Sequence, residues 1–410
     1  MLQPSRSEID SATAWRIAWL VLVMLSVSQG APLVAVVGLK PIAADLGITR
    51  SDAALASSLA WFGAGAGGIA MGLLAERHGV RFTAMLGTVC VAGGLALSTL
   101  GEPWQLLAGH GLLLGAFGNG ALWPPLLIYV SRWFERKRGA AVALISSGQY
   151  FAGVLWPWVF ERGIAGIGWR RTMLAFAVLV LATVLPLALF ALRPAPEVSR
   201  PAPAKPGAAP APVLGMPPNL VQGLLCAAAF FCCVPMAMPA QHLVAHCTDI
   251  GISASHGAAM LSVLLFCAFL SRQFWGWASD KVGGLATVFL GSLAQAIAST
   301  GFLLTQDEAG LFFVAGAFGL GFAGIIPAYF MAVRSLFPAR EMSWRVPTQM
   351  FCGLTGMAFG GWLAGAIYDR VGFYGAAFAT GIGFNILNLM LVGWLLWRER
   401  RSRALRLALA

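Results

Sequence analysis

The sequence predicts an all-α membrane protein whose twelve transmembrane helices form two pseudo-symmetric six-helix bundles. Three observations lead to this prediction: the composition, the number of long apolar runs, and a repeat at half the chain length. Of the 410 residues, 59% are hydrophobic and 10% are charged, whereas a soluble domain carries about 25% charged residues. A soluble globular protein is therefore excluded, and the lipid bilayer is the expected surrounding of the chain.

Twelve apolar runs are long enough to cross a bilayer as helices, which takes about 20 residues each. The residues before the first run include Glu8 and Asp10, and that run is too long for the core of a signal peptide. We therefore expect the first run to remain as a helix. The runs lie at 16–39, 53–75, 82–100, 104–131, 139–160 and 171–192, and then at 219–246, 256–278, 285–304, 309–333, 345–368 and 374–397.

A Pro- and Ala-rich segment, RPAPEVSRPAPAKPGAAPAPVLGMPP, separates the sixth run from the seventh. Its repeated prolines exclude a continuous helix, because proline lacks a backbone N–H and clashes with the preceding turn. We therefore expect an N-terminal six-helix bundle at 1–192, a cytoplasmic linker at 193–218, and a C-terminal six-helix bundle with a basic cytoplasmic tail at 219–410.

The distribution of Lys and Arg predicts the orientation. Of the 27 such residues, 20 fall on the side that holds both termini, six fall on the other side, and Arg272 lies within a run. Basic loops stay in the cytoplasm, so we expect a multi-pass protein of the cell inner (plasma) membrane with both termini cytoplasmic. The net charge of +11 is spread over these short loops, so nucleic acid is not an expected partner.

Neither an enzyme nor a metal site is predicted. The chain has no GxSxG, HExxH or P-loop pattern and no paired carboxylates in a plausible cleft. Its seven Cys lie mostly inside apolar runs without metal-ligand spacing, and His242 and His246 have no third ligand. We therefore expect no cofactor.

An internal repeat relates the second-to-third connection to the eighth-to-ninth. GLLAERHGVR begins at Gly72 and GWASDKVGG at Gly276, at an offset of 204, and half the chain is 205. A second echo pairs GAFGNG at 115–120 with GAFGLG at 316–321. Two parallel halves explain both offsets. The first copy contains Gly72, Glu76, Arg77, Gly79 and Arg81, and the second contains Gly276, Asp280, Lys281 and Gly283.

Arg272 is the residue that points most directly to a ligand. It has apolar sequence on both sides, and placing Arg inside a spanning helix costs about 2.5 to 3.5 kcal/mol. It lies six residues before Ala278, so its side chain could instead snorkel to the nearby helix end. Helical side chains lean toward the N-terminus of their helix, which on the predicted orientation is toward the membrane centre. This favours a bound anion.

The repeated Gly-x-x-x-acid-basic-x-Gly pattern resembles the signature of the major facilitator superfamily. More narrowly, Trp104–Leu144 and His242–Ser253 followed by SRQFWGWASDKVG look like the bacterial monocarboxylate transporter and oxalate:formate antiporter branch. In that branch, an arginine four residues before the glycine that opens the eighth-helix motif binds the substrate carboxylate. The resemblance thus implies that Arg272, four residues before Gly276, has this role in a transporter of a small organic anion.

Two departures from that branch concern coupling and the substrate. Proton symporters of this kind often carry an aspartate one turn before the arginine, where this chain has Ala268. Animal members carry a lysine in the first helix, where the broken stretch SQGAP offers Gln29, and the antiporter's lysine has no counterpart at 346–368. Proton symport and exchange against a counter-anion both stay open, and the missing acid favours exchange.

The signature loops are expected to gate the conformational change. Gly72 and Gly276 would allow close helix approach, and Glu76 and Asp280 would accept hydrogen bonds from a neighbouring helix N-terminus. The alternative is that Glu76 and Asp280 are ordinary solvated turn charges.

Further polar residues beside helix breaks are candidates for the wall of a midplane cavity, where irregular backbone is tolerated. Trp156 and Trp158 are expected in the interfacial belt instead. The candidate cavity residues are Gln29, Trp123 beside Pro124–Pro125, Gln149, Tyr150, and Tyr329 beside Pro327.

Two alternatives to anion transport remain at this stage. A drug or sugar-acid facilitator would rely on the aromatic lining more than on Arg272. A non-transporting anion sensor would bind without flux, although the short linker and tail contain no signalling domain.

Overall fold

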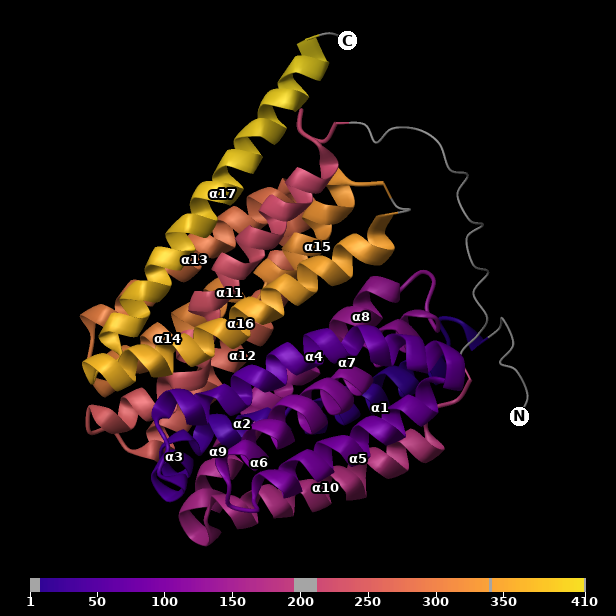
Figure 1. Cartoon of the computed structure of the whole chain (residues 1–410). Helices are drawn as coiled ribbons and strands as arrows, with labels where there is room; N and C mark the ends of the chain where they lie inside the picture. Colours follow the sequence, from indigo (N-terminus) through magenta and orange to yellow (C-terminus); the bar gives the residue numbers. More distant parts are fainter. Residues whose placement is uncertain (1–7, 195–211, 339–340, 409–410) are drawn as a thin grey trace. The chain divides into compact units, whose positions relative to one another are not determined.

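The structure is a computed structural model that describes residues 8–194, 212–338 and 341–408, and nearly all of these residues are helical (Figure 1). Within this part of the chain, twelve helical stretches are long and apolar enough to cross a membrane. They run from Ala12–Val37 to Gly375–Ser402 and follow the order of the twelve predicted runs. The predicted all-α class and the number of spans are therefore confirmed.

Several spans consist of more than one helical piece, because Gly and Pro interrupt the regular hydrogen bonding. The first six spans are built from α1 (Ala12–Ser28) and α2 (Ala31–Val37), followed by the short α3 (Leu39–Leu46), then α4 (Arg50–His78), α5 (Val80–Ser98), α6 (Pro103–Ala108) with the π-helix η2 (Gly109–Asn119) and α7 (Gly120–Ser131), α8 (Arg138–Ser146) with α9 (Gly148–Ile167), and α10 (Trp169–Phe190). The last six are built from α11 (Pro218–Asp249), α12 (Ala254–Val282), α13 (Gly284–Leu304), α14 (Glu308–Phe322) with α15 (Ile325–Leu336), α16 (Met342–Val371) and α17 (Gly375–Ala408).

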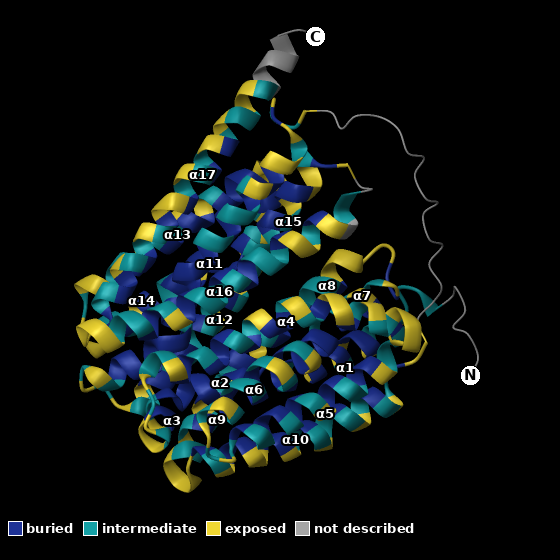
Figure 2. Ribbon diagram, viewed as in Figure 1, coloured by how far each residue is buried: buried dark blue, intermediate teal, exposed yellow. Residues whose placement is uncertain are grey.

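The chain forms two compact units. The first comprises residues 1–200 together with 241–262, and the second comprises 201–240 together with 263–410. The end of α11 and the start of α12 thus pack with the first unit, although the expected division assigns them to the C-terminal bundle. Most helices carry a buried face inside their unit and an exposed apolar face, as expected where lipid surrounds the protein (Figure 2).

Single glycines make three of the helix-to-helix turns. Gly79, Gly168 and Gly283 have φ of 86°, 82° and 88° and ψ of 153°, 160° and 161°. This region of backbone space is open essentially to Gly alone. Gly79 and Gly283 hold the same place in the two copies of the repeat, so the repeated sequence encodes a repeated backbone turn.

Glycines also allow close packing between helices. A Cβ added to Gly63 or Gly67 of α4 would collide with the backbone of η2, and a Cβ added to Gly319 of α14 would collide with the Leu264 carbonyl of α12. Small residues at such crossings let helix backbones approach, which favours van der Waals packing in a membrane.

One aromatic prediction is wrong. Trp156 lies inside the first unit with 9% of its surface exposed, and its indole N–H donates to the Ser26 carbonyl at 2.8 Å. Its ring fills the space beside Gly30, at the break between α1 and α2, because Gly has no side chain there. Trp158 is 44% exposed, and the Arg162 guanidinium lies 3.8 Å from its ring centroid.

Candidate functional site

Arg272 lies on a part of α12 that is fixed to α14. The Leu320 backbone carbonyl accepts a hydrogen bond from the Ser271 hydroxyl at 2.7 Å and one from the Trp275 indole N–H at 3.0 Å. At 3.6 residues per turn, Arg272 points about 100° away from Ser271 and about 60° away from Trp275. The half-buried Arg272 side chain therefore points to one side of the contact with α14 and not into it.

Close packing continues on both sides of Arg272. One turn before it, Ala268 is fully buried, and its backbone nitrogen lies 3.1 Å from the position of a Cβ added to Gly319. One turn after it, the Trp275 side chain occupies the space that a Cβ on Gly324 would need. An aspartate at position 268 would therefore meet a tightly packed helix contact, which explains in steric terms why a small residue suits this position.

Tyr329 belongs to a buried hydrogen-bonded chain within the second unit. Its side chain is 3% exposed, and its hydroxyl donates to the Asn388 Oδ1 at 2.8 Å. The Asn388 Nδ2 donates to the Ser292 hydroxyl at 2.8 Å. This chain joins α15, α17 and α13. The Tyr329 hydroxyl is engaged in packing here, and its assignment to the substrate stays a prediction.

In the first unit, the candidate residues lie on α1, α7 and α9. Gln29 forms the C-terminal cap of α1 and is 7% exposed, and Tyr150 of α9 is 2% exposed. Gln149 of α9 and Trp123 of α7 are half-buried. Their roles in substrate binding are not tested by these positions and stay predictions.

The contact between α1 and α9 places two of these residues on neighbouring helices. A Cβ added to Gly148 would lie 2.9 Å from the Leu25 Cβ, and Gly30 faces the Trp156 ring. Tyr150 lies between these two contacts along α9, and Gln29 lies between them along α1. The unit therefore brings Gln29 and Tyr150 to one helix interface.

The signature glycines differ from the expectation. At Gly72 and Gly276, an added Cβ would meet no described heavy atom within 4 Å, so the predicted close approach is absent from this structure. The glycines that the backbone requires are Gly79 and Gly283, which have positive φ. The sequence pattern does not distinguish a helical position from a turn, so it did not show that the backbone requirement falls on the second glycine of each pair. The role of Gly72 and Gly276 in gating stays a prediction.

The signature acids are also exposed. Glu76 and Asp280 have no hydrogen-bond or ion-pair partner among the described residues, so the expected contact with a helix N-terminus is not seen. Arg77 is exposed beside Glu76, and Lys281 lies 4.0 Å from the centroid of the Trp277 ring. Their part in gating stays a prediction.

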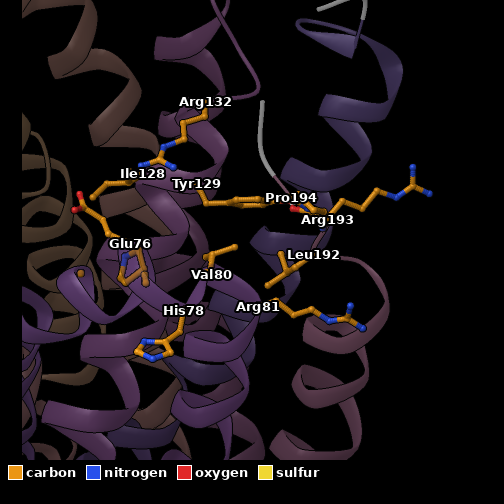
Figure 3. A pocket seen from close by; sticks show the side chains of 14 residues that line it. Glu76, His78, Val80, Arg81, Ile128, Tyr129, Arg132, Leu192, Arg193 and Pro194 are labelled. Carbon is orange, nitrogen blue, oxygen red and sulfur yellow. Dashed lines mark hydrogen bonds between the residues drawn. The ribbon is translucent and has the colours of Figure 1, made fainter. Parts of the chain in front are cut away.

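A pocket of about 450 Å³ surrounds the first signature loop (Figure 3). We call it the loop pocket. Its wall comes from the end of α4, the start of α5, the end of α7 and the residues that follow α10. The lining residues are Gly72, Ala75, Glu76, His78, Gly79, Val80, Arg81, Pro125, Ile128, Tyr129, Arg132, Leu192, Arg193 and Pro194.

An acidic residue that the sequence patterns did not single out joins distant parts of the first unit. The Asp249 carboxylate at the end of α11 accepts hydrogen bonds from Lys40 of α3 at 2.8 Å and from two guanidinium nitrogens of Arg50 at the start of α4. About two turns further along α4, the Ser57 hydroxyl donates to the Gln241 side chain at 2.7 Å. Asp249 lies 209 residues from Lys40 and 199 from Arg50 in sequence, so no local pattern could reveal the pairing.

A small cavity lies beside this ion cluster. It has a volume of about 200 Å³ and includes Lys40, Glu161 and Thr248 in its lining. Glu161 thus lies at the same end of the first unit as Asp249. The sequence does place Lys40, Glu161 and Asp249 just after the ends of apolar runs, and this position was the available hint that they lie near one surface of the membrane.

Arg345, the first residue of the predicted run at 345–368, is another functional candidate that the sequence patterns did not single out. Its side chain is 2% exposed and forms an ion pair with Glu341 at 2.7 Å. A second guanidinium hydrogen bond reaches Asn219 at 3.2 Å, and the Phe337 ring centroid lies 4.0 Å from the guanidinium carbon. Arg345 thus joins the start of α16 to the start of α11 within the second unit.

Among the described residues, no group of three His, Cys, Asp or Glu side chains is arranged to hold a metal ion. His110 is fully buried, and its Nδ1 lies 2.9 Å from the Ser98 hydroxyl.

The chain is similar in sequence to several proteins that are named as transporters or efflux proteins. The chain is 25% identical to MFS-type transporter 1 of Ophiocordyceps sp. over 68% of this chain and 62% of that protein. It is 26% identical to the Fujikurins efflux protein of Gibberella fujikuroi over 67% of this chain and 58% of that protein. It is also 26% identical to Monocarboxylate transporter 13 of Bos taurus over 76% of this chain and 72% of that protein.

A solved structure agrees in fold. It is a bacterial homologue of the human lysosomal transporter Spinster in an inward-facing and occupied conformation, with a TM-score of 0.69 and 14% identity. The match covers 95% of this chain and 97% of that chain. The family model described as Major Facilitator Superfamily matches residues 18–343 and 223–408. The chain therefore belongs to the major facilitator superfamily, and it is a multi-pass membrane transporter.

Proposed function

We propose that this protein is a secondary active transporter of a small organic anion, a monocarboxylate by class, that works by alternating access of its two bundles. The observation that carries the proposal is Arg272, a half-buried guanidinium within a spanning helix whose direction is set by the contacts of Ser271 and Trp275. The relative named Monocarboxylate transporter 13 supports the same substrate class.

A guanidinium suits this role because it can hold a carboxylate through two parallel hydrogen bonds. Each hydrogen bond to a charged group contributes about 1.5 to 3 kcal/mol. Loss of both should lower uptake of carboxylate at subsaturating concentration by about 100-fold or more. Arg272→Lys should recover little of this loss, because an ammonium is a point charge without the paired donor geometry.

The test is uptake of labelled monocarboxylates into proteoliposomes by the unmodified chain, Arg272→Ala and Arg272→Lys. Arg334→Ala is the matched control, since Arg334 is an exposed arginine at the end of α15. The control should transport normally. Near-normal uptake by a well-inserted Arg272→Ala protein would refute the proposal. It would indicate that the Arg272 side chain extends to the nearby helix end and does not bind the substrate.

Exchange against a counter-anion is the coupling mode we propose. Ala268 occupies the position where an acid could neutralise Arg272, and His110 is engaged with Ser98. Moving a positive charge through the membrane is unfavourable, and a bound anion would compensate the charge of Arg272 during the conformational change. Internal unlabelled anion should therefore stimulate uptake. Strong uptake into empty vesicles driven by a pH gradient alone would contradict exchange and support proton symport.

Efflux of a larger, less polar compound is the second candidate, favoured by the similarity to the Fujikurins efflux protein. This activity would depend on the aromatic candidates Trp123 and Tyr150 more than on Arg272. Export of an uncharged compound that persists in Arg272→Ala would support it. Carboxylate binding with zero flux would instead indicate an anion sensor.

The inner (plasma) membrane and cytoplasmic termini are part of the same proposal, based on the distribution of basic loops. Fusion of a reporter that is active only in the cytoplasm to the C-terminus tests the orientation.

A further inference from the structure

We propose that the loop pocket binds a phosphate group and that its occupant is the head group of an anionic phospholipid. The pocket lies at the end of the first unit, where α4 turns into α5 and where α7 ends. Because α4, α5 and α7 belong to stretches long enough to span a bilayer, their ends at this pocket are expected at the membrane edge. The site is separate from Arg272 and does not depend on the proposed substrate.

The charge of the lining favours an anion. Arg81, Arg132 and Arg193 contribute three positive charges, and Glu76 contributes one negative charge. Among the described residues, none of the three guanidinium groups has an ion-pair partner. Figure 3 shows Arg132 on the side of Glu76, whereas the side chains of Arg81 and Arg193 extend away from these two residues on the opposite side. Basic pockets between transmembrane helices on the cytoplasmic side bind phosphate-bearing lipid head groups.

A tyrosine fixes the position of Arg193, one of the three arginines that line the loop pocket. The Tyr129 hydroxyl donates to the Arg193 carbonyl at 2.9 Å and accepts from the Arg193 backbone N–H at 3.2 Å. Tyr129 is 3% exposed and Leu192 is likewise 3% exposed, so the chain after α10 is anchored to α7. Arg193 is therefore held at the pocket although it is the first residue of the predicted linker.

The apolar part of the lining favours a lipid over a soluble phosphate compound. Val80, Pro125, Ile128 and Leu192 contribute hydrocarbon surface to the same pocket as the arginines. Ile128 is 51% exposed, so some of this surface is open. A phospholipid matches both parts, because its phosphate is joined to glycerol and acyl chains.

The experiment compares two variants of the full-length purified protein with equal net charge. Arg132→Gln/Arg193→Gln removes two positive charges from the lining of the loop pocket. Arg136→Gln/Lys137→Gln removes two exposed charges from the neighbouring loop, outside the pocket lining. Binding of phosphatidylglycerol is titrated by native mass spectrometry, with phosphatidylcholine as the zwitterionic comparison. Competition by inorganic phosphate distinguishes the two sources of the phosphate group.

Each basic residue near an anionic head group contributes about fivefold to binding. The pocket variant should therefore bind phosphatidylglycerol about 20-fold more weakly, and the loop variant should stay within about threefold of the unmodified chain. Tyr129→Phe keeps the ring but releases Arg193, so it should weaken binding by a few fold. Inorganic phosphate should compete for the pocket.

Equal loss in the two double variants would show general surface attraction and overturn the proposal. Unchanged binding in the pocket variant, or equal affinity for phosphatidylcholine, would also overturn it. Binding of inorganic phosphate without phosphatidylglycerol would support the phosphate site and assign it to a soluble ligand.

Discussion

The two kinds of signature glycine should respond in opposite ways to alanine. Gly79 and Gly283 have φ near +87° with extended ψ, a region that costs an alanine about 1 to 3 kcal/mol. Gly72 and Gly276 are helical and face open space, where alanine stabilises a helix by about 0.5 to 1 kcal/mol. The free energy of unfolding should thus differ by about 2 kcal/mol or more between the two classes.

The assay is unfolding of each purified single variant in mixed micelles, followed by circular dichroism during titration with a denaturing detergent. Gly79→Ala and Gly283→Ala should unfold earlier than the unmodified chain, and Gly72→Ala and Gly276→Ala should not. Equal stability of all four variants would refute the assignment of the backbone requirement to the turn. A Gly72→Ala protein that is stable but transports slowly would instead reveal a close approach in another conformation.

Three further predictions concern charged groups. Asp249→Asn should lower the melting temperature about as much as Arg50→Gln, and the double variant should not add the two losses, because both remove the same ion cluster with Lys40. Asp280→Asn should slow exchange while substrate affinity stays within a few fold; a large loss of affinity with unchanged turnover would contradict its gating role. The backbone N–H of Arg136 donates to the Asp10 carboxylate and lowers the pKa of Asp10 below its ordinary 3.8. Asp10 should therefore stabilise the fold above pH 3.8 and lose this effect as the pH falls through the lowered pKa. Melting temperatures of the unmodified chain and Asp10→Ala across pH 3 to 7 check this, and a gap between the two that widens in acid would contradict it.

The helices could be predicted because a membrane leaves few choices for the backbone. In lipid, each backbone polar group needs a partner within the protein, so a run of about 20 apolar residues becomes a helix. The repeat that relates Gly79 to Gly283 likewise locates two equivalent turns from the order of the residues alone. Local composition and period were sufficient for these features.

Side-chain environments were harder to predict, because they depend on contacts between distant parts of the chain. Trp156 has the composition of an interfacial aromatic, and only its position against Gly30 places it inside the unit. Arg345 follows a predicted loop, and its burial comes from Asn219 and Phe337 on other segments. The loop pocket likewise requires the chain after α10 to return to α7.

The two halves share a backbone repeat, but several residues that line the loop pocket differ between them, and this bears on what the pocket does. At the offset of 202 that relates Arg132 to Arg334, the position equivalent to Tyr129 is Met331, which has no hydroxyl to anchor a following segment. At the offset of 204, Arg81 corresponds to Leu285, which is 2% exposed. The turn glycines are therefore explained by the backbone geometry that both halves need. Arg81 and Tyr129 have no chemical counterpart in the second half, whereas Arg132 has one in Arg334. The repeated backbone does not require a residue that one half lacks, which supports the assignment of Arg81 and of the Tyr129-anchored Arg193 to a ligand.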